Sequence, residues 1–431
     1  MSQSTGRLRA LVPGCVFESQ FDEDLEAVFI SETGVLNILT PGTLQGRADT
    51  LPCLLFDSAE ELPAWAQAML RSAPKKMSTH DLLAHIVAST HQDDPEAPVI
   101  VEREDRRTAE SVEEIAGEEQ HFCLYWEDGE LHVIGTPGFF EVERYDITRN
   151  IFSRNTGILE TDIMASKRAV ILGCGSVGSL VASELARAGV GNFLLIDMDL
   201  LEYHNICRHQ CGVKDVGRRK PDVVRDLVLN INPTARVETF YAEVQQAPLE
   251  LLESWCRPGE TIVFGCADNR EVDRYGNFVA ANHGVAFLSI GFWERAFAGE
   301  VFYWLPGQGH ACYTCALGEG DSLSQRVEAN HHIYTSQTDL AAVNFEPGIA
   351  VDIDFVTIVG VKLALDIFNR DDPRFTQRLL PHLTQYTLIC NTNEPAVGGE
   401  MAEIFSYPLQ VTTSIRVSSK PGCLVCSDEA R

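Results

Sequence analysis

The stretch Arg168-Ala-Val-Ile-Leu-Gly-Cys-Gly-Ser-Val-Gly178 decides the fold. It begins with an apolar run typical of a buried strand, and residues 179–189 after the glycines have the spacing of a helix. A second apolar run, residues 192–197, ends on an acid. Strand, helix and strand in this order form a βαβ unit, which predicts an α/β fold with a Rossmann-like, doubly wound, mostly parallel sheet.

The rest of the chain falls into two parts of different character. Downstream, a helix near residues 220–230, a strand near Val237, a helix over 248–255 and a strand over 261–264 continue the alternation. Upstream, short strand-like runs (26–30, 122–126, 130–134) mix with helix-like ones (60–71, 79–89), and a charged, Pro-containing stretch over 92–120 is typical of a linker. We therefore predict a smaller N-terminal α+β domain over residues 1–140 and the α/β domain over residues 141–431.

Composition narrows the class of protein. The net charge is −28, from 62 acidic against 34 basic residues, and such a surface repels the phosphates of a nucleic acid. No apolar run approaches the length of about 18 residues that a membrane span needs, and the N-terminus lacks the pattern of a secretion signal. Thirteen cysteines, an odd number, fit a reducing cytoplasm with metal sites better than a disulfide framework. We expect a cytoplasmic protein with neither a nucleic-acid nor a membrane partner.

The glycine loop predicts a site for a phosphate. Gly173, Gly175 and Gly178 let the backbone turn tightly and approach an anion, and Ser176 lies where the following helix offers its free N–H groups. Asp197, 24 residues beyond Gly173, ends the second strand, where a carboxylate can bind ribose hydroxyls. This pattern does not distinguish NAD from ATP. A closely packed strand–helix turn without any ligand is the structural alternative.

Polar residues further along favour ATP. Asp199, Asn205, Arg208 and Lys220 follow the second strand, and a hydride-transferring enzyme has no evident need for them. Attack on the α-phosphate of ATP builds up negative charge that cations must neutralise. Asp268 follows the strand at 261–264, where a carboxylate can hold the Mg²⁺ that bridges the phosphates. Each residue alone is more often a surface ion-pair partner or a helix cap, but as an ordered set they indicate one site.

This ordered set resembles the adenylation domain of the ThiF/MoeB/HesA-type ubiquitin-activating enzyme superfamily, over residues 141–431. The resemblance implies ATP-dependent adenylation of the C-terminal carboxylate of a ubiquitin-like carrier protein that ends in glycine, with release of pyrophosphate. It also implies that Asp197 binds the ribose, that Asn205, Arg208 and Lys220 hold the triphosphate, and that Asp268 binds Mg²⁺. The nucleotide-binding set so implied is Gly173, Gly175, Ser176, Gly178, Asp197, Asp199, Asn205, Arg208, Lys220 and Asp268.

The resemblance implies a homodimer as well. Its members carry an arginine ahead of the fold that reaches into the neighbouring protomer's site. Arg149 matches this arginine in its distance from the glycine loop, and Arg144 is the alternative. Cys207 and His209 stand where other polar residues are usual in the superfamily, and we assign them no role.

Two Cys-x-x-Cys pairs predict a metal site. Cys312 and Cys315 form one pair, and Cys423 and Cys426 form the other. Four thiolates satisfy tetrahedral Zn²⁺ and leave no open position, so the zinc would be structural and would join distant parts of the fold. A redox role is the alternative for either pair alone.

No cysteine stands where compact members of the superfamily carry a thioester-forming nucleophile. The corresponding stretch, 316–348, contains Ser322, Ser324, His331, His332 and Glu346 but no cysteine. Cys211 is the remaining loop cysteine; Cys174, Cys266 and Cys390 suit the role less. We therefore expect the adenylate to pass to a thiol of a partner, such as a conjugating enzyme.

Several alternatives stay open at this point. The substrate could be a peptide or another small carboxylate, with the N-terminal domain binding the peptide, the carrier or a conjugating enzyme. A tRNA substrate conflicts with the acidity. Two alternative functions come from other classes of protein: an NAD-binding oxidoreductase and a non-catalytic scaffold. The finer resemblance is to activators in bacterial ubiquitin-like conjugation and antiphage operons, with a sulfur-carrier pathway as the alternative.

Overall fold

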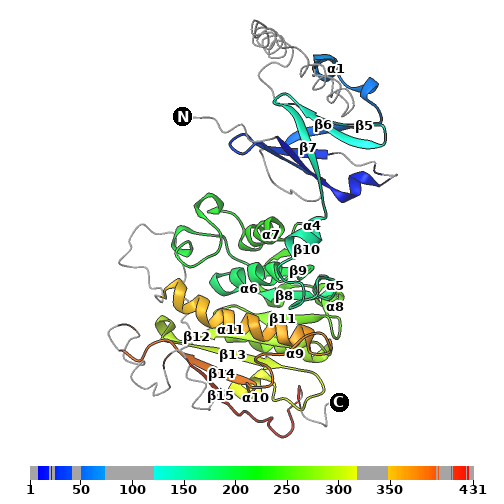
Figure 1. Cartoon of the computed structure of the whole chain (residues 1–431). Coiled ribbons are helices and arrows are strands. Elements are labelled where there is room, and N and C mark those ends of the chain that lie inside the picture. The colour runs from blue at the N-terminus through cyan, green and yellow to red at the C-terminus, as the bar shows by residue number, and fades with distance from the viewer. Residues whose placement is uncertain are drawn as a thin grey trace, which may run out of the picture. The chain divides into compact units, whose positions relative to one another are not determined.

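The computed structural model describes residues 8–18, 21, 25–40, 50–72, 121–317, 348–394, 397, 409, 411–423 and 425–426. The chain divides into two compact units, Met1–Ile147 and Thr148–Arg431 (Figure 1). Several features expected from the sequence lie outside the described residues: the helix near 79–89, the linker over 92–120, and the serines, histidines and glutamate of the 316–348 stretch.

In its described residues, the first unit is a closed barrel of seven strands. Their order around the barrel is β1-β3-β2-β4-β5-β6-β7, and β7 closes it by pairing in parallel with β1. Alternate residues point inward, as Ala10 and Val12 of β1 do, and they form one buried core. The three strands expected here are confirmed. The strands are β1 (Arg9–Pro13), β2 (Leu25–Ile30), β3 (Val35–Leu39), β4 (Leu51–Phe56), β5 (Phe122–Glu127), β6 (Glu130–Gly135) and β7 (Gly138–Tyr145), with helix α1 (Ala64–Ser72) after β4.

The second unit is built on an eight-stranded sheet. Its order is β10-β9-β8-β11-β12-β13-β14-β15; the pairs from β10 to β12 are parallel and those from β12 to β15 antiparallel. The predicted α/β fold with a mostly parallel sheet is therefore confirmed. The strands are β8 (Arg168–Leu172), β9 (Asn192–Asp197), β10 (Arg236–Tyr241), β11 (Thr261–Gly265), β12 (Ala286–Phe292), β13 (Ala298–Trp304), β14 (Tyr386–Cys390) and β15 (Thr412–Ile415).

Helices cover both faces of this sheet. In β8, Ala169 and Ile171 belong to the core under α6, α7 and α11, whereas Val170 and Leu172 belong to the core under α8, α9 and α10. Burial on both faces is the reason why these strands are continuous apolar runs rather than alternating ones. The helices of the unit are α4 (Ile147–Ile151), α5 (Thr161–Ser166), α6 (Ser176–Arg187), α7 (Lys220–Ile231), α8 (Leu249–Trp255), α9 (Arg270–Asn282), α10 (Tyr313–Leu317) and α11 (Ala350–Asn369).

The strand order reverses between β8 and β11. From β8 the chain moves to β9 and β10 on one side, and then crosses to β11 on the other side of β8. At such a switch point, the loops at the carboxyl ends of the two strands separate and leave room for a ligand. The glycine loop follows β8 and Asp268 follows β11, so both predicted phosphate-binding features belong to this point.

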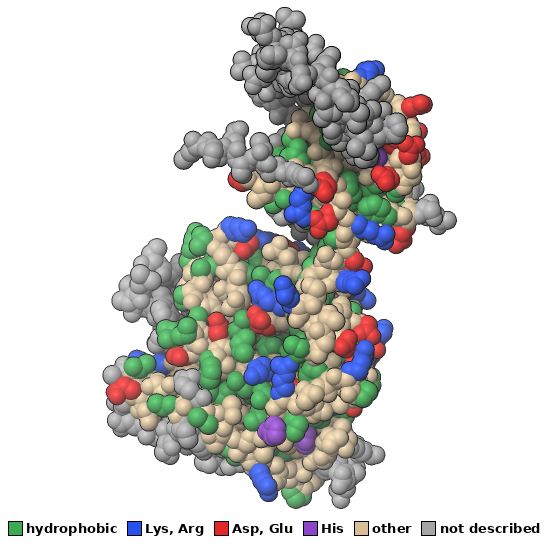
Figure 2. All heavy atoms as spheres, viewed as in Figure 1, with side chains coloured by type: hydrophobic (Ala, Val, Ile, Leu, Met, Phe, Trp, Pro, Cys, Tyr) green, Lys and Arg blue, Asp and Glu red, His purple; other side chains and the backbone are tan. Residues whose placement is uncertain are grey.

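Among the described residues, no helix combines the length and apolarity that crossing a membrane requires. On the visible face of the molecule, acidic and basic side chains are interspersed (Figure 2).

Candidate nucleotide site

The three glycines of the loop serve two different purposes. Gly173 has φ +97°, and a Cβ there would lie 2.8 Å from the backbone nitrogen of Ala267; a Cβ on Gly178 would lie 1.9 Å from the carbonyl oxygen of Gly173. Both positions therefore need glycine for packing alone. A Cβ on Gly175 would meet nothing within 4 Å. Space is therefore open at Gly175, next to the first residue of α6. Close packing explains why glycine stands at 173 and 178, but it does not explain why glycine stands at 175.

Asp197 anchors the loop from the end of β9. Its Oδ2 accepts the backbone N–H of Cys174 at 2.6 Å, and its Oδ1 accepts the N–H of Asp199 at 2.7 Å. The side chain is buried, and burial raises its pKa while Lys220 opposes the rise. Asp197 thus shapes the loop, and each oxygen keeps a further lone pair that a ribose hydroxyl can use.

Lys220 lies among carboxylates. Its Nζ donates to Asp199 Oδ2 at 2.7 Å, and its backbone N–H donates to the carbonyl of Asp199 at 3.0 Å. The side chain is buried; burial acts to lower its pKa, but Asp197, Asp199 and then Asp268 outweigh it, so the pKa is raised. The ammonium is therefore charged: it donates to Asp199 directly, and the negative charges of Asp197 and Asp268 also stabilise it.

Asp268 is exposed directly after β11, and the next residue, Asn269, caps α9 by accepting the N–H of Glu271 at 2.9 Å. The cap fixes the start of α9 next to Asp268, which is itself exposed. An exposed carboxylate beside a phosphate loop is the type of ligand that Mg²⁺ uses.

Asn205 ends a short 3₁₀ turn after β9, Tyr203–Asn205, and Arg208 lies in the turn that follows it. Asn205 Oδ1 accepts the N–H of Glu202 at 2.9 Å, which fixes the side chain and leaves its NH₂ group to donate. Arg208 reaches toward the start of α11: its Nη1 lies 3.8 Å from the position that a Cβ on Gly348 would take.

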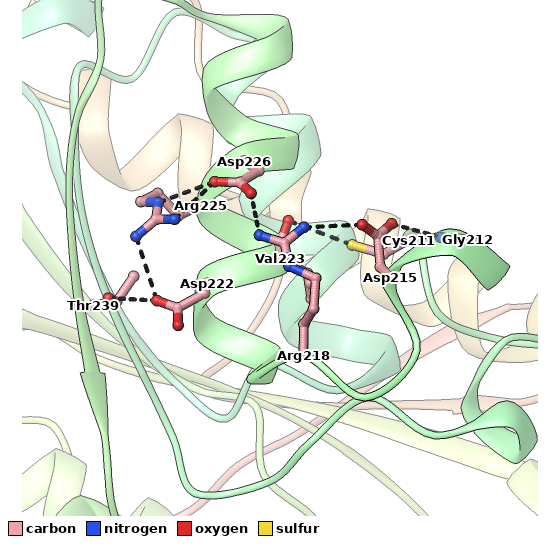
Figure 3. A network of polar contacts seen from close by, with 9 residues as sticks. All are labelled: Cys211, Gly212, Asp215, Arg218, Asp222, Val223, Arg225, Asp226 and Thr239. Carbon is pink, nitrogen blue, oxygen red and sulfur yellow. Dashed lines mark hydrogen bonds and ion pairs between the residues drawn. The ribbon is translucent and has the colours of Figure 1, made fainter. Parts of the chain in front are cut away.

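A chain of polar contacts holds the segment between Arg208 and Lys220 (Figure 3). Arg218 donates to Asp215 at 3.0 Å and also to Asp226 of α7, while Gly212 N–H donates to Asp215 Oδ2 at 3.3 Å. The chain continues along α7 through Arg225 and Asp222 and ends at Thr239 of β10. Because these groups are partly exposed, their contacts add little to the free energy of unfolding. Their main effect is to fix the path of the segment.

A strained turn borders the same edge of the sheet. Arg295 and Ala296, between β12 and β13, have φ of 53° and 52°, a conformation that residues other than glycine rarely adopt. Asn391 holds the turn, because its Nδ2 donates to the carbonyl oxygens of Ala296 at 2.9 Å and of Asp352 at 3.2 Å. Ala296 Cβ lies 3.6 Å from the position of a Cβ on Gly348, the glycine that Arg208 approaches.

Neither His209 nor Asn391 was assigned a role from the sequence. His209 Nε2 lies 2.8 Å from the carbonyl oxygen of Cys174 in the glycine loop. Asn391 lies one residue after β14 and donates to the carbonyl oxygens of Ala296 and Asp352. The contacts of both side chains join segments far apart in the chain, and no local pattern carries that information.

Arg144 and Arg149 lie on different units. Arg144, on β7 of the barrel, stacks over the ring of Phe17 at 5.2 Å. Arg149 is exposed on α4. Arg144 is exposed as well, so exposure does not decide between the two; Arg149 stays our prediction and Arg144 the alternative.

The four predicted metal ligands come together. The sulfur atoms of Cys312, Cys315, Cys423 and Cys426 all lie within 4.8 Å of one another. Sγ–Sγ distances are 3.5 Å for Cys312–Cys423 and 3.7 Å for Cys315–Cys426, close to the ~3.8 Å edge of a tetrahedron with Zn–S bonds of about 2.3 Å. The backbone N–H of Lys420 points at Cys315 Sγ at 3.3 Å, as a partner of a thiolate would. The donor set fits Zn²⁺ and joins α10 to the segment after β15.

Three buried cysteines near the glycine loop, Cys174, Cys211 and Cys266, offer no activated thiol. Burial raises the pKa of Cys211 to about 12, and it raises the pKa values of Cys174 and Cys266 well above their usual range. These thiols stay protonated near neutral pH and are shielded from a substrate. Cys211, the loop cysteine that the sequence left as a nucleophile, therefore has neither the exposure nor the charge for that role.

A doubly wound sheet with an open glycine loop, a buried lysine and acids at its switch point defines a nucleotide-binding α/β protein. Residues 147–396, more than half of the chain, match the model of the ThiF family. The chain belongs to the ThiF family, which confirms the resemblance found in the sequence.

Curated relatives match a shorter region. Ubiquitin-like modifier-activating enzyme 5 of Caenorhabditis elegans is 27% identical over 163 residues, 36% of this chain and 39% of that protein. The protein of the same name from Oryza sativa subsp. japonica is 30% identical over 155 residues, 34% of this chain and 37% of that protein. The match thus spans less than half the length of these relatives. Among solved structures, E. coli MccB with ATP has a TM-score of 0.44 at 20% identity and covers 62% of this chain and 68% of that one.

Proposed function

We propose that this chain is an ATP-dependent adenylyltransferase that activates the C-terminal carboxylate of a ubiquitin-like protein and releases pyrophosphate. The observation that carries the proposal is the buried ion pair of Lys220 with Asp199 at the carboxyl edge of the sheet, where Asp197 ends β9, Asp268 follows β11 and the face of Gly175 is open. Family membership and the names of the curated relatives support it.

In the proposed reaction, a carboxylate oxygen of the substrate attacks the α-phosphorus of ATP. The new O–P bond forms the acyl-adenylate, and the bond to the β-phosphate oxygen breaks, so that pyrophosphate leaves with the electron pair. Lys220 and Arg208 neutralise the charge that develops on the phosphates, and the N–H groups at the start of α6 bind them. Asp268 would hold Mg²⁺, which would supply positive charge against the phosphates.

The substrate would approach along the edge of the sheet bordered by Arg208, Gly348 and the turn at Arg295. This edge lies past the carboxyl ends of the strands, where an extended peptide tail can reach the nucleotide. A tail ending in glycine suits such a route because it lacks a side chain at the reacting end. Arg149 of a second copy would complete the site, which makes the proposed enzyme a homodimer.

The adenylate would then pass to a thiol on another protein, such as a conjugating enzyme. Cys211, Cys174 and Cys266 are buried and protonated, so they do not supply that thiol. Pathways of bacterial ubiquitin-like conjugation, including antiphage defence, and of sulfur transfer both use this chemistry.

Exchange of radiolabelled pyrophosphate into ATP tests the proposal. Candidate carrier proteins ending in glycine, and short peptides as a separate arm, would be offered to the wild type with Mg²⁺. We expect exchange with a carrier, and a loss of about a hundredfold or more in Asp268→Ala. Asp371→Ala is the matched control, because Asp371 is an acid exposed outside the site.

The arms of this assay separate the alternatives. Exchange with peptides alone would replace the carrier by a peptide substrate. No exchange with any carrier or peptide, together with tight binding of NAD, would overturn the proposal in favour of an oxidoreductase, a reading that leaves the cluster around Lys220 unexplained.

A further inference from the structure

His209 bridges two segments of backbone from a buried position. Its Nε2 lies 2.8 Å from the carbonyl oxygen of Cys174, and its Nδ1 lies 3.1 Å from the backbone nitrogen of Cys211. Only 7% of the residue is exposed. The two contacts join the glycine loop to the segment that carries Arg208, 35 residues further along the chain.

These contacts fix the state of the imidazole. The backbone nitrogen of Cys211 can only donate, so Nδ1 must carry a lone pair. The carbonyl oxygen of Cys174 can only accept, so Nε2 must carry the hydrogen. Both bonds exist together only in the neutral ring with its hydrogen on Nε2. A proton on Nδ1 would place two N–H groups against each other.

The bridge fixes Cys174 from both sides. Its N–H is bound by Asp197 and its carbonyl by His209, so the peptide units on either side of Cys174 have no freedom to rotate. Cys174 immediately precedes Gly175, the glycine with open space in front of it. His209 also immediately follows Arg208. One ring therefore sets the position of the loop that receives the phosphates relative to a cation that is predicted to bind them.

We propose that His209 is a positioning residue of the nucleotide site, whose neutral imidazole holds the glycine loop and the Arg208 segment in register for a triphosphate. The inference rests on the proposed function only in that the site binds ATP. It goes beyond the proposed function by assigning a role to a residue that touches neither the nucleotide nor the substrate.

Electrostatics agree with a neutral ring. Burial lowers the pKa of His209; the hydrogen bond to Cys174 acts in the opposite direction, and Lys220 of α7 lowers the pKa while Asp215 of the preceding 3₁₀ turn raises it. Lys220 and Asp215 are the charged groups that act on the ring, and the thiols of Cys174 and Cys211, both protonated, belong to the residues that it bridges.

Three substitutions separate positioning from simple packing. His209→Gln keeps an N–H that can donate to Cys174, His209→Phe fills the volume without hydrogen bonds, and His209→Ala removes both. Binding of a fluorescent ATP analogue with Mg²⁺, without any carrier, is the measurement, and the melting temperature is followed alongside. His132→Ala, in the barrel, is the matched control for loss of an imidazole.

We expect the Phe and Ala variants to lose about tenfold in affinity, the value of one hydrogen bond of ordinary strength, and the Gln variant to recover most of it. Wild-type affinity should also fall as the pH decreases below the ordinary histidine range of about 6.5. The Gln variant should lack this part of the fall and show only the pH dependence that ATP itself contributes. His132→Ala should bind as the wild type does.

Equal affinities for the Phe and Gln variants at every pH would overturn the proposal, even if their melting temperatures fall, because packing alone would then explain the ring. The outcome is independent of the adenylation test. If the order of affinities holds but no carrier supports pyrophosphate exchange, the proposed function fails and the role of His209 stands. If exchange is observed and the Phe variant binds ATP as the wild type does, only the role of His209 fails.

Discussion

At the scale of single residues, substitution by alanine should affect stability at Gly178 and ATP binding at Gly175. A Cβ on Gly178 would overlap the carbonyl of Gly173, whereas a Cβ on Gly175 has open space. Gly178→Ala should destabilise the α/β unit by about 3 kcal/mol or more, since backbone must move to admit the methyl group. Gly175→Ala should leave the free energy of unfolding nearly unchanged but weaken ATP binding, because the methyl group enters the space of the phosphate.

Urea unfolding and ATP titration of the two variants check this pair. A stable Gly175→Ala variant that binds ATP as tightly as the wild type would show that the open space beside the loop does not receive a phosphate.

His209 predicts a dependence of stability on pH. Its pKa in the folded state is lowered, mainly by burial, so the unfolded chain binds more protons as the pH falls. The contribution of His209 is therefore fully present above the unfolded pKa of about 6.5 and is lost as the pH decreases through the folded pKa. The free energy of unfolding of the wild type should decline toward that of His209→Phe between neutral and mildly acidic pH. Parallel curves for the two proteins would contradict the sign of this shift.

The left-handed turn predicts a stabilising substitution. Arg295 is exposed and has φ 53°, a conformation that costs a residue with a side chain about 1 kcal/mol and costs glycine almost nothing. Arg295→Gly should raise the free energy of unfolding by up to about 1 kcal/mol. Arg295→Ala removes the same guanidinium but keeps the strain, so it is the control. An equal gain for both variants would assign the effect to the loss of charge instead.

At the scale of the elements, the sequence predicted those strands whose own residues show their burial, and it did not predict pairings between distant strands. The strands β8, β9 and β11 are buried on both faces, and the apolar runs that result were visible directly. The barrel was not foreseen, because β1 pairs in parallel with both β3 and β7, and the second pairing joins residues more than a hundred positions apart. Alternation within a strand indicates which residues face inward, but it does not indicate which distant strand lies beside it.

Asp366, a buried acid on helix α11, has a structural role that can be tested. Asp366 Oδ2 accepts the backbone N–H groups of Arg378, Leu379 and Leu380 at 2.8, 2.5 and 2.9 Å, so it holds the loop that leads to β14. Asp366→Asn keeps the shape but loses the charge that strengthens these bonds, and should cost about 2–3 kcal/mol. Asp371→Asn, on the surface after the same helix, should cost almost nothing. Denaturant unfolding measures both, and similar losses for the two acids would contradict the account.

At the scale of the whole molecule, the candidate site was predictable where chain order follows sheet topology. Asp197, Lys220 and Asp268 each belong to the carboxyl edge of the sheet, because each follows a strand or begins the next helix there. His209 and Asn391 were missed because their contacts depend on where separate segments meet. The Cys-x-x-Cys pairs were an exception among distant contacts, since metal chemistry itself specifies four sulfur atoms.

If the cysteine cluster binds zinc, removal of one of its ligands should destabilise only one of the two units. Zinc would tie α10 to the segment after β15, the last strand of the sheet in the described residues. Cys426→Ser should abolish zinc retention, lower the melting temperature of the α/β unit by several degrees and increase hydrogen exchange in β14, β15 and α10, because an edge strand loses its covalent anchor. The barrel strands should exchange as in the wild type, since they belong to the other compact unit. Cys207→Ser is the matched control, because Cys207 is exposed outside the cluster and its loss should leave the zinc content unchanged. Full zinc content in Cys426→Ser, or an equal increase of exchange in the barrel, would show that the cluster does not clasp this part of the fold.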